Sequence, residues 1–209
     1  MGEEIQSLDF SEDDFTRFHQ RLREETRLLG EWMEAGRFAN AVPCCGLELE
    51  AWLTTPDYVP SPSNKRFLEA LNHPLVGTEL SQFNFELNST PQKLGEGGAQ
   101  SLTNMHKELD DTWAACVHVS EGMDLHAITI GSIPTLEDNM LTLETMSKGN
   151  RYQAMNQQLF HLQDGEPTFF NIEEGETLYV EKADIMLEAA STSLQVHFQV
   201  PQAQALRVY

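Results

Sequence analysis

Three separated segments of this 209-residue chain alternate apolar and polar residues, and this alternation constrains the fold more than any other feature. The first is "GLELEAWL", which runs from Gly46 to Leu53. Successive side chains of a strand point to opposite faces, so Glu48 and Glu50 share one face while the leucines take the other. The segment therefore predicts a strand with two carboxylates side by side on an otherwise apolar element.

The other two segments repeat this arrangement. In "ELSQFNFELN", residues 79–88, one face carries Phe83, Phe85 and Leu87, and the other carries Asn84, Glu86 and Asn88. In "STSLQVHFQVP", residues 191–201, one face carries Leu194, Val196 and Phe198, and the other carries Ser193, Gln195, His197 and Gln199. Such alternation favours a mostly antiparallel sheet with helices on one face and a polar, open second face.

Helical periodicity accounts for much of the remaining chain. Apolar residues recur at helical spacing over 11–33, and 64–71, 98–119 and 152–159 also predict helices. The aromatic stripe of the first helix is typical of core packing. Residues 127–133 predict a third strand and 164–176 a turn-rich hairpin, whereas 185–191 fit neither period. With no repeat or linker in between, we expect one α+β domain over residues 1–209.

The charge balance excludes several classes of partner. The chain has 13 Lys and Arg against 33 Asp and Glu, a net charge of −20. That field repels a nucleic-acid backbone and an anionic membrane surface, so we expect neither as a partner. ATP stays compatible with this charge, because bound metal ions offset the charge of its phosphates.

Targeting features and cysteines indicate the cytoplasm. No apolar run approaches the ~20 residues that a membrane-spanning helix needs, and the acidic start "MGEEIQSLDFSEDD" lacks the pattern of a signal peptide. The three cysteines, Cys44, Cys45 and Cys116, are an odd, small number without metal-ligand spacing. They predict small buried side chains in a reducing compartment rather than a disulfide framework.

The polar faces of the three strands suggest a metal site. If the strands share one sheet, the carboxylates of Glu48, Glu50, Glu79 and Glu86 converge with the imidazole of His197. Like charges that close repel each other, and divalent cations relieve the repulsion. Carboxylate oxygens suit Mg²⁺ or Mn²⁺, and one histidine shifts the preference towards Mn²⁺ or Zn²⁺. The alternative is a solvated acidic sheet face with an ordinary surface histidine.

Four stretches give the chain a resemblance to a known family. They are "GLELEAWL", "TELSQFNFELNSTPQKL", "IGSIPTLEDNMLTLETMSKGNRYQAMNQQL" and "ASTSLQVHFQVP", in this order over most of residues 46–201. With them the chain resembles the carboxylate–amine ligases of the glutamate–cysteine ligase type 2 group. The resemblance implies a fold like the glutamine synthetase catalytic domain, a curved antiparallel sheet with helices on its outer face.

The resemblance also implies an activity, that of a ligase of glutathione biosynthesis. ATP would phosphorylate the γ-carboxylate of glutamate, and the amine of cysteine would attack the acyl phosphate. Mg²⁺ or Mn²⁺ would bridge the phosphates. The family match implies that Glu50, Glu79 and Glu86 hold one ion and that Glu48 and His197 help to hold a second. The segment Asn150, Arg151 and Tyr152 also matches a segment of the family. This match implies that Arg151 lies in the catalytic site and contacts an anionic substrate.

The chain departs from the family in its length. It stops at Tyr209, shortly after the histidine strand, whereas family members continue and supply nucleotide-binding residues there. We therefore expect the N-terminal part of a ligase catalytic domain, with little activity of its own and exposed sheet edges that favour a homo-oligomer. The alternatives are a non-catalytic remnant that binds metal or amino acids, and an interaction domain whose acidic face is only solvated.

Overall fold

The computed structural model describes residues 4–38, 42–95 and 98–209. The chain divides into two compact units. The first unit comprises Met1–Leu8, Glu48–Asn88 and Asp110–Leu194, and the second comprises Asp9–Leu47, Ser89–Leu109 and Gln195–Tyr209. One domain over residues 1–209 stays a prediction.

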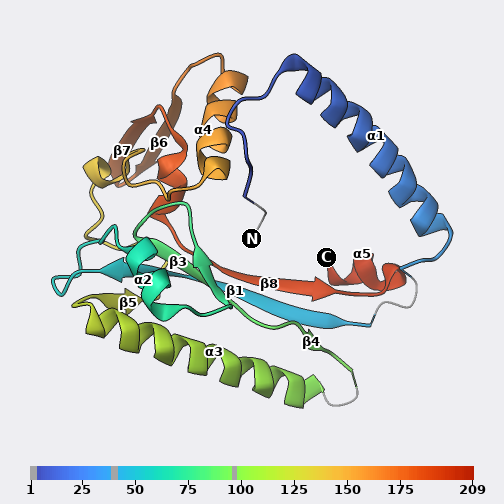
Figure 1. Cartoon of the computed structure of the whole chain (residues 1–209), viewed down its shortest axis with the longest axis horizontal. Coiled ribbons are helices and arrows are strands. Elements are labelled where there is room, and N and C mark those ends of the chain that lie inside the picture. Colours follow the sequence, from blue (N-terminus) through green and yellow to red (C-terminus); the bar gives the residue numbers. More distant parts are fainter. Residues whose placement is uncertain (1–3, 39–41, 96–97) are drawn as a thin grey trace. The chain divides into compact units, whose positions relative to one another are not determined.

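Helices and antiparallel strands alternate irregularly along the chain, which confirms a mixed α+β fold (Figure 1). The helices are α1 (Glu12–Glu34), α2 (Asn64–Leu71), α3 (Gly98–Gly122), α4 (Asn150–Leu162) and α5 (Ala205–Val208), with 3-10 helices η1 (Asp138–Met140), η2 (Ile185–Ala190) and η3 (Gln202–Gln204). The strands are β1 (Cys44–Thr54), β2 (Val76–Thr78), β3 (Asn84–Asn88), β4 (Gln92–Lys93), β5 (His126–Ile128), β6 (Thr168–Glu174), β7 (Glu176–Lys182) and β8 (Leu194–Gln199).

Strand β1, which contains the "GLELEAWL" segment, organises the larger sheet. It pairs with β3, β4, β5 and β8, and β2 extends the sheet on the far side of β3. The pairings of β1 with β3, β4 and β5 and of β2 with β3 are antiparallel. Strands β6 and β7 form a separate antiparallel hairpin, in the region where the sequence predicts one.

The apolar face of the sheet in the first unit packs on helices, as the alternation predicts. Ala51 and Leu53 of β1 and Phe85 and Leu87 of β3 are fully buried there. Residues of α2 and of the second half of α3 cover them, among them Phe67 and Cys116. Burying such side chains contributes about 1.5–3 kcal/mol each, so this cluster fixes which face of β1 and β3 points inward.

The opposite face is not open along its whole length, which corrects the expected polar, solvated face. Trp52 lies on that face, is fully buried and stacks on Phe83 with ring centroids 5.6 Å apart. Tyr152 of α4 and Ile185 and Met186 of η2 belong to the same apolar cluster. Phe83 therefore packs on this side, and the prediction that it shares a face with Phe85 is wrong.

The segment expected as one strand over 79–88 is a turn followed by a short strand. Strand β3 begins only at Asn84, whose backbone N–H donates to the carbonyl of Ser81 at 3.2 Å. Asn64, at the start of α2, holds this turn, because its Nδ2 donates to the carbonyls of Ser81 at 3.0 Å and Asn84 at 3.2 Å. Glu79 thus lies before the turn rather than on β3.

In the second unit, α1 begins where the sequence predicts. Ser11 caps it, and the side chains and backbones of Ser11 and Asp14 form a reciprocal capping box. None of the described residues of α1 is buried, and Phe18 and Leu22 are exposed on its apolar stripe, so the expectation of core packing is wrong. The helical period marks which face is apolar but not what covers it.

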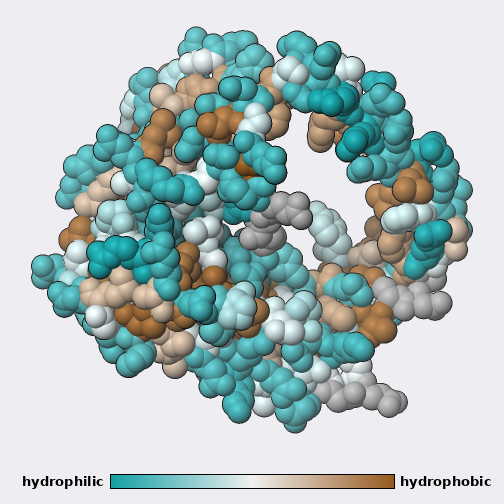
Figure 2. Space-filling model, in the orientation of Figure 1, coloured by the Kyte–Doolittle hydropathy of each residue, from teal (hydrophilic) through white to brown (hydrophobic). Residues whose placement is uncertain are grey.

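Hydrophilic residues cover much of the visible face in Figure 2, with smaller apolar patches between them. In the part of the chain that the structure describes, no helix is both long enough and apolar enough to cross a membrane.

Candidate functional site

The register of β1 and β3 brings carboxylates together on the polar face. Glu50 lies directly opposite Glu86, and Glu48 lies opposite Asn88. Glu48 is only 8% exposed and Glu86 only 5% exposed. Like charges directly opposite each other destabilise a strand pair, so the fold tolerates a local cost here. Proteins accept such a cost at functional sites, where residues serve binding or chemistry rather than the stability of the fold.

Glu79 adds a third carboxyl group to this pair. Burial raises the pKa of Glu79 from 4.5 to about 8, and a hydrogen bond with Glu86 and the negative charges of Glu86 and Glu50 act in the same direction. The backbone N–H of Leu80 donates to Glu79 Oε2 at 3.1 Å and opposes the shift. The raised pKa therefore favours the protonated form of Glu79 at neutral pH.

Neighbouring groups hold two of these carboxylates in fixed orientations. The backbone N–H and the hydroxyl of Ser193 each donate to an oxygen of Glu50 at 2.9 Å. Asn88 Nδ2 donates to Glu86 Oε1 at 2.6 Å. Donors of this kind orient the oxygens that an ion or a substrate would meet, as outer partners do in metal sites.

Two of these carboxylates line a cavity of about 170 Å³ in the first unit. Its lining consists of Glu50, Glu79, Leu80, Asn84, Tyr152, Met155, Glu188, Ala189 and Ser191. Among the described residues that line it there is no Lys, Arg or His. The wall is thus acidic and apolar, which suits a cation.

Asn84 gives this cavity a buried polar group with unused hydrogen-bonding capacity. Its residue is only 3% exposed, and its Nδ2 finds no acceptor among the described residues. Its Oδ1, in contrast, accepts a hydrogen bond from the Ser81 hydroxyl. Buried donors are nearly always paired, so the fold leaves an unusual unsatisfied group beside the cavity.

Glu188, which the sequence pattern did not indicate, is an exposed residue in the lining of the cavity. It belongs to η2, whose start is capped by Asp184, because that carboxylate accepts a hydrogen bond from the Met186 N–H at 2.9 Å. Ile185 and Met186 are buried in this short helix, whereas Glu188 is exposed. The signal available in the sequence was Asp184 in front of an apolar pair, which is an N-cap pattern.

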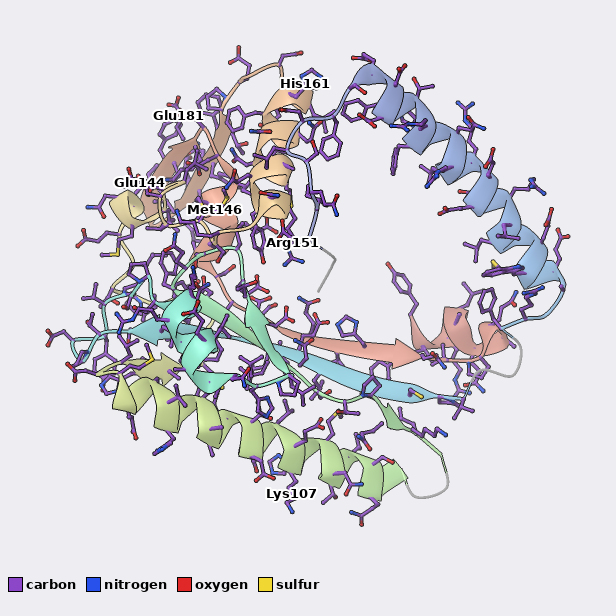
Figure 3. All side chains as sticks on the ribbon, viewed as in Figure 1. Lys107, Glu144, Met146, Arg151, His161 and Glu181 are labelled. Carbon is purple, nitrogen blue, oxygen red and sulfur yellow. The ribbon has the colours of Figure 1, made fainter. Side chains whose placement is uncertain are left out.

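Arg151 lies in the first turn of α4 (Figure 3) and lines a second cavity, of about 240 Å³. Its guanidinium carbon lies 4.5 Å from the centre of the Tyr152 ring, and its Nη2 donates to the Tyr152 hydroxyl. That hydroxyl donates in turn to the carbonyl of Thr78 at 3.2 Å. Tyr152 lines both cavities, so it is the residue that connects Arg151 with the carboxylates.

The Arg151 cavity already contains a carboxylate of the chain itself. Glu4 Oε1 accepts hydrogen bonds from the backbone N–H groups of Asn150 at 2.6 Å and Arg151 at 3.2 Å. These N–H groups belong to the first turn of α4, where backbone donors have no partner within the helix itself. An anionic group therefore fits this helix start. The contact of Arg151 with an anionic substrate stays a prediction.

His197 lies on β8 in the second unit, where the residue is exposed. Glu48, Glu50, Glu79 and Glu86 all lie in the first unit. Joint binding of a second ion by Glu48 and His197 stays a prediction.

The donor set fits a hard divalent cation in chemistry. Carboxylate oxygens are the ligands that Mg²⁺ and Mn²⁺ prefer, and the neighbouring negative charges that help to raise the pKa of Glu79 would also favour a cation at this place. Within residues 4–38, 42–95 and 98–209, however, no three His, Cys, Asp or Glu side chains are close enough to hold one ion as they stand. Binding of an ion there would therefore require side-chain rotation.

Comparisons of the chain with models of known protein families, with curated proteins and with solved structures each gave no match.

Proposed function

We propose that the chain carries the cation-binding acidic face of an ATP-dependent carboxylate–amine ligase of the glutamate–cysteine ligase type 2 group, with the sheet of a glutamine synthetase-like fold. The observation that carries the proposal is the direct pairing of Glu50 with Glu86, with the carboxyl group of Glu79 hydrogen-bonded beside them. The resemblance assigns these same three residues to one ion.

In this proposal Glu50, Glu79 and Glu86 hold a divalent ion near the amino-acid substrates, where it would supply positive charge when bound. Ser193 and Asn88 keep the oxygens of Glu50 and Glu86 oriented. Glu79 releases its proton on binding, so the affinity for the ion rises with pH up to about the pKa of Glu79, which lies at about 8.

The reaction implied has two balanced steps. A γ-carboxylate oxygen of glutamate bonds to the terminal phosphorus of ATP, and ADP leaves. The amine nitrogen of the acceptor then bonds to the acyl carbon, phosphate leaves, and the nitrogen loses a proton. The guanidinium of Arg151 and the N–H groups of the first turn of α4 hold the anionic part of glutamate in place of the Glu4 carboxylate. The compartment proposed is the cytoplasm.

Sequential calorimetric titration of the chain with Mn²⁺ and then glutamate tests this function. We expect glutamate to bind only after Mn²⁺, and Arg151→Ala to weaken glutamate binding about tenfold or more while leaving Mn²⁺ binding unchanged, because it removes a charge-assisted hydrogen bond. Arg151→Lys keeps the positive charge but loses the planar pair of guanidinium donors. Its affinity for glutamate should therefore lie between those of wild type and Arg151→Ala.

The other outcomes separate the rival functions. Binding of Mn²⁺ without any binding of glutamate indicates a metal-binding remnant of the fold. Binding of neither ligand indicates an interaction domain and contradicts the ligase.

A further inference from the structure

The N-terminal segment of the first unit, residues 4–8, contacts the start of α4 through two of its residues. Glu4 Oε1 accepts hydrogen bonds from the backbone N–H groups of Asn150 at 2.6 Å and Arg151 at 3.2 Å. Asn150 Nδ2 also donates to the carbonyl of Ile5 at 2.9 Å. The segment thus presents a carboxylate to this helix start in the way that a separate anionic ligand would.

Gly149, the residue before α4, leaves the space that this carboxylate takes. A Cβ at Gly149 would lie 2.9 Å from Glu4 Oε2, closer than Cβ atoms approach other heavy atoms in proteins. The backbone of Gly149 is extended, with φ −152° and ψ 141°, a conformation that any residue adopts. What the glycine permits here is therefore the close approach of the carboxylate, not an unusual backbone conformation.

The cavity of about 240 Å³ around this contact is basic. Lys148 and Arg151 line it, and Glu4 is the one acid among its described lining residues. In a chain with a net charge of −20, two basic side chains beside a helix N-terminus mark a place where an anion is favourable. The volume far exceeds the ~10–15 Å³ that one water molecule needs, so a ligand of several heavy atoms fits.

The contact of the N-terminal segment is of the kind that opens. Glu4 is exposed, and Glu4 and Ile5 lie outside helices and strands. Segments with few buried contacts open at low free-energy cost. While the segment is bound, its carboxylate acts as a tethered competitor, with an effective concentration on the order of millimolar. The apparent affinity of a separate ligand then falls in proportion to the fraction of molecules in which the site is open.

We propose that Glu4 is an internal competitor: its carboxylate closes the anion site at the start of α4, and a free carboxylate ligand enters only when the N-terminal segment leaves. The identity of that ligand as glutamate rests on the proposed ligase function, whereas the competition itself does not. The chain therefore binds its carboxylate ligand more weakly than the open site does.

Glutarate is the probe, because it has a carboxylate on the same short alkyl link as Glu4 and no ammonium group that the basic cavity would repel. Calorimetric titration at neutral pH without metal measures its affinity. We expect Glu4→Gln, which keeps the size but loses the charge, to bind glutarate at least about fivefold more tightly than wild type. Glu69→Gln, the same change at an exposed position of α2, should bind it as wild type does. Equal affinities in all three proteins, or no binding of glutarate to Glu4→Gln, would overturn the proposal.

The NMR signal of the Glu4 carboxyl carbon reports displacement directly, and a role of Glu4 in capping α4 alone does not predict that a ligand moves it. The signal is identified by its loss in Glu4→Gln. Gly149→Ala gives its position for a displaced carboxylate, because the added Cβ takes the space of Glu4 Oε2. We expect glutarate to move the wild-type signal towards that position. A signal that stays in place while glutarate binds shows two separate sites and overturns the competition.

Mn²⁺ and glutamate, titrated into the same proteins, separate this proposal from the ligase function. If glutarate displaces Glu4 but Mn²⁺ does not bind, the competition stands and the ligase function fails. If Mn²⁺ and glutamate bind, but Glu4→Gln binds glutamate no more tightly than wild type and the Glu4 signal stays in place, the ligase function stands and the competition is overturned.

Discussion

Glu79→Gln is expected to raise the melting temperature of the chain near pH 8 and to leave it nearly unchanged near pH 4. The pKa of Glu79 is raised from 4.5 to about 8 by burial, by its hydrogen bond with Glu86 and by the charges of Glu86 and Glu50. Between these values the folded chain holds a proton that the unfolded chain has released. The contribution of this group to stability is therefore complete below about 4.5 and is lost as the pH rises through about 8.

A glutamine at this position imitates the protonated acid at every pH, because its amide can donate to Glu86. The difference in melting temperature between variant and wild type should therefore grow from pH 4 to pH 8, at roughly 2–4 °C for each kcal/mol in a chain of this size. Glu69→Gln, which removes an exposed charge, serves as the control and should run parallel to wild type. Parallel curves for Glu79→Gln as well would show that the three carboxylates are not coupled.

Trp52→Ala should destabilise the first unit by about 3–5 kcal/mol, the usual cost of removing a large buried aromatic side chain. Trp52 is fully buried, stacks on Phe83, and donates from Nε1 to the carbonyl of Ile130 at 2.8 Å. It lies opposite Asn84 in the strand register, next to the pair formed by Glu50 and Glu86. Denaturant unfolding followed by circular dichroism measures the loss.

Trp52→Phe separates packing from hydrogen bonding at this position. It retains a ring for Phe83 but loses the hydrogen bond from Nε1 to the Ile130 carbonyl, which keeps the Thr192 hydroxyl as a donor at 2.7 Å, so the loss should cost about 0.5–1.5 kcal/mol. The phenylalanine variant should thus lie between wild type and Trp52→Ala. A Trp52→Ala variant as stable as wild type would contradict the packing described for the polar face of the sheet.

The acidic centre of the site could be predicted from the sequence because strand alternation is local. Glu48 and Glu50 share a face whatever the partner strand is, and the same holds for Glu86 and Asn88. The strand register that places Glu50 opposite Glu86 could not be predicted from the sequence, because it depends on where β3 begins. That start at Asn84 is set by a turn held by Asn64, a contact between distant residues.

The remaining parts of the site depend on tertiary structure. Glu188 lies on a short 3-10 helix whose apolar residues have no clear period, so no face could be assigned to it. Alternation placed Asn84 correctly on the polar face of the sheet. Its unused donor, however, results from the burial of that face by residues of α4 and η2, and the pattern did not predict this covering. For α1 the error is the opposite one. Its helical periodicity predicted a buried apolar stripe, but none of the described residues of α1 is buried.

Calorimetric titration with Mn²⁺ at about pH 8 tests most directly whether Glu50, Glu79 and Glu86 form a divalent-cation site. The comparison is between wild type, Glu79→Gln/Glu86→Gln, and Glu69→Gln/Glu121→Gln, which removes the same charge from exposed helix positions. The account predicts binding with proton release for wild type and the control variant, and affinity at least about tenfold lower for Glu79→Gln/Glu86→Gln. Equal affinities in all three proteins, or no binding to any of them, would contradict it.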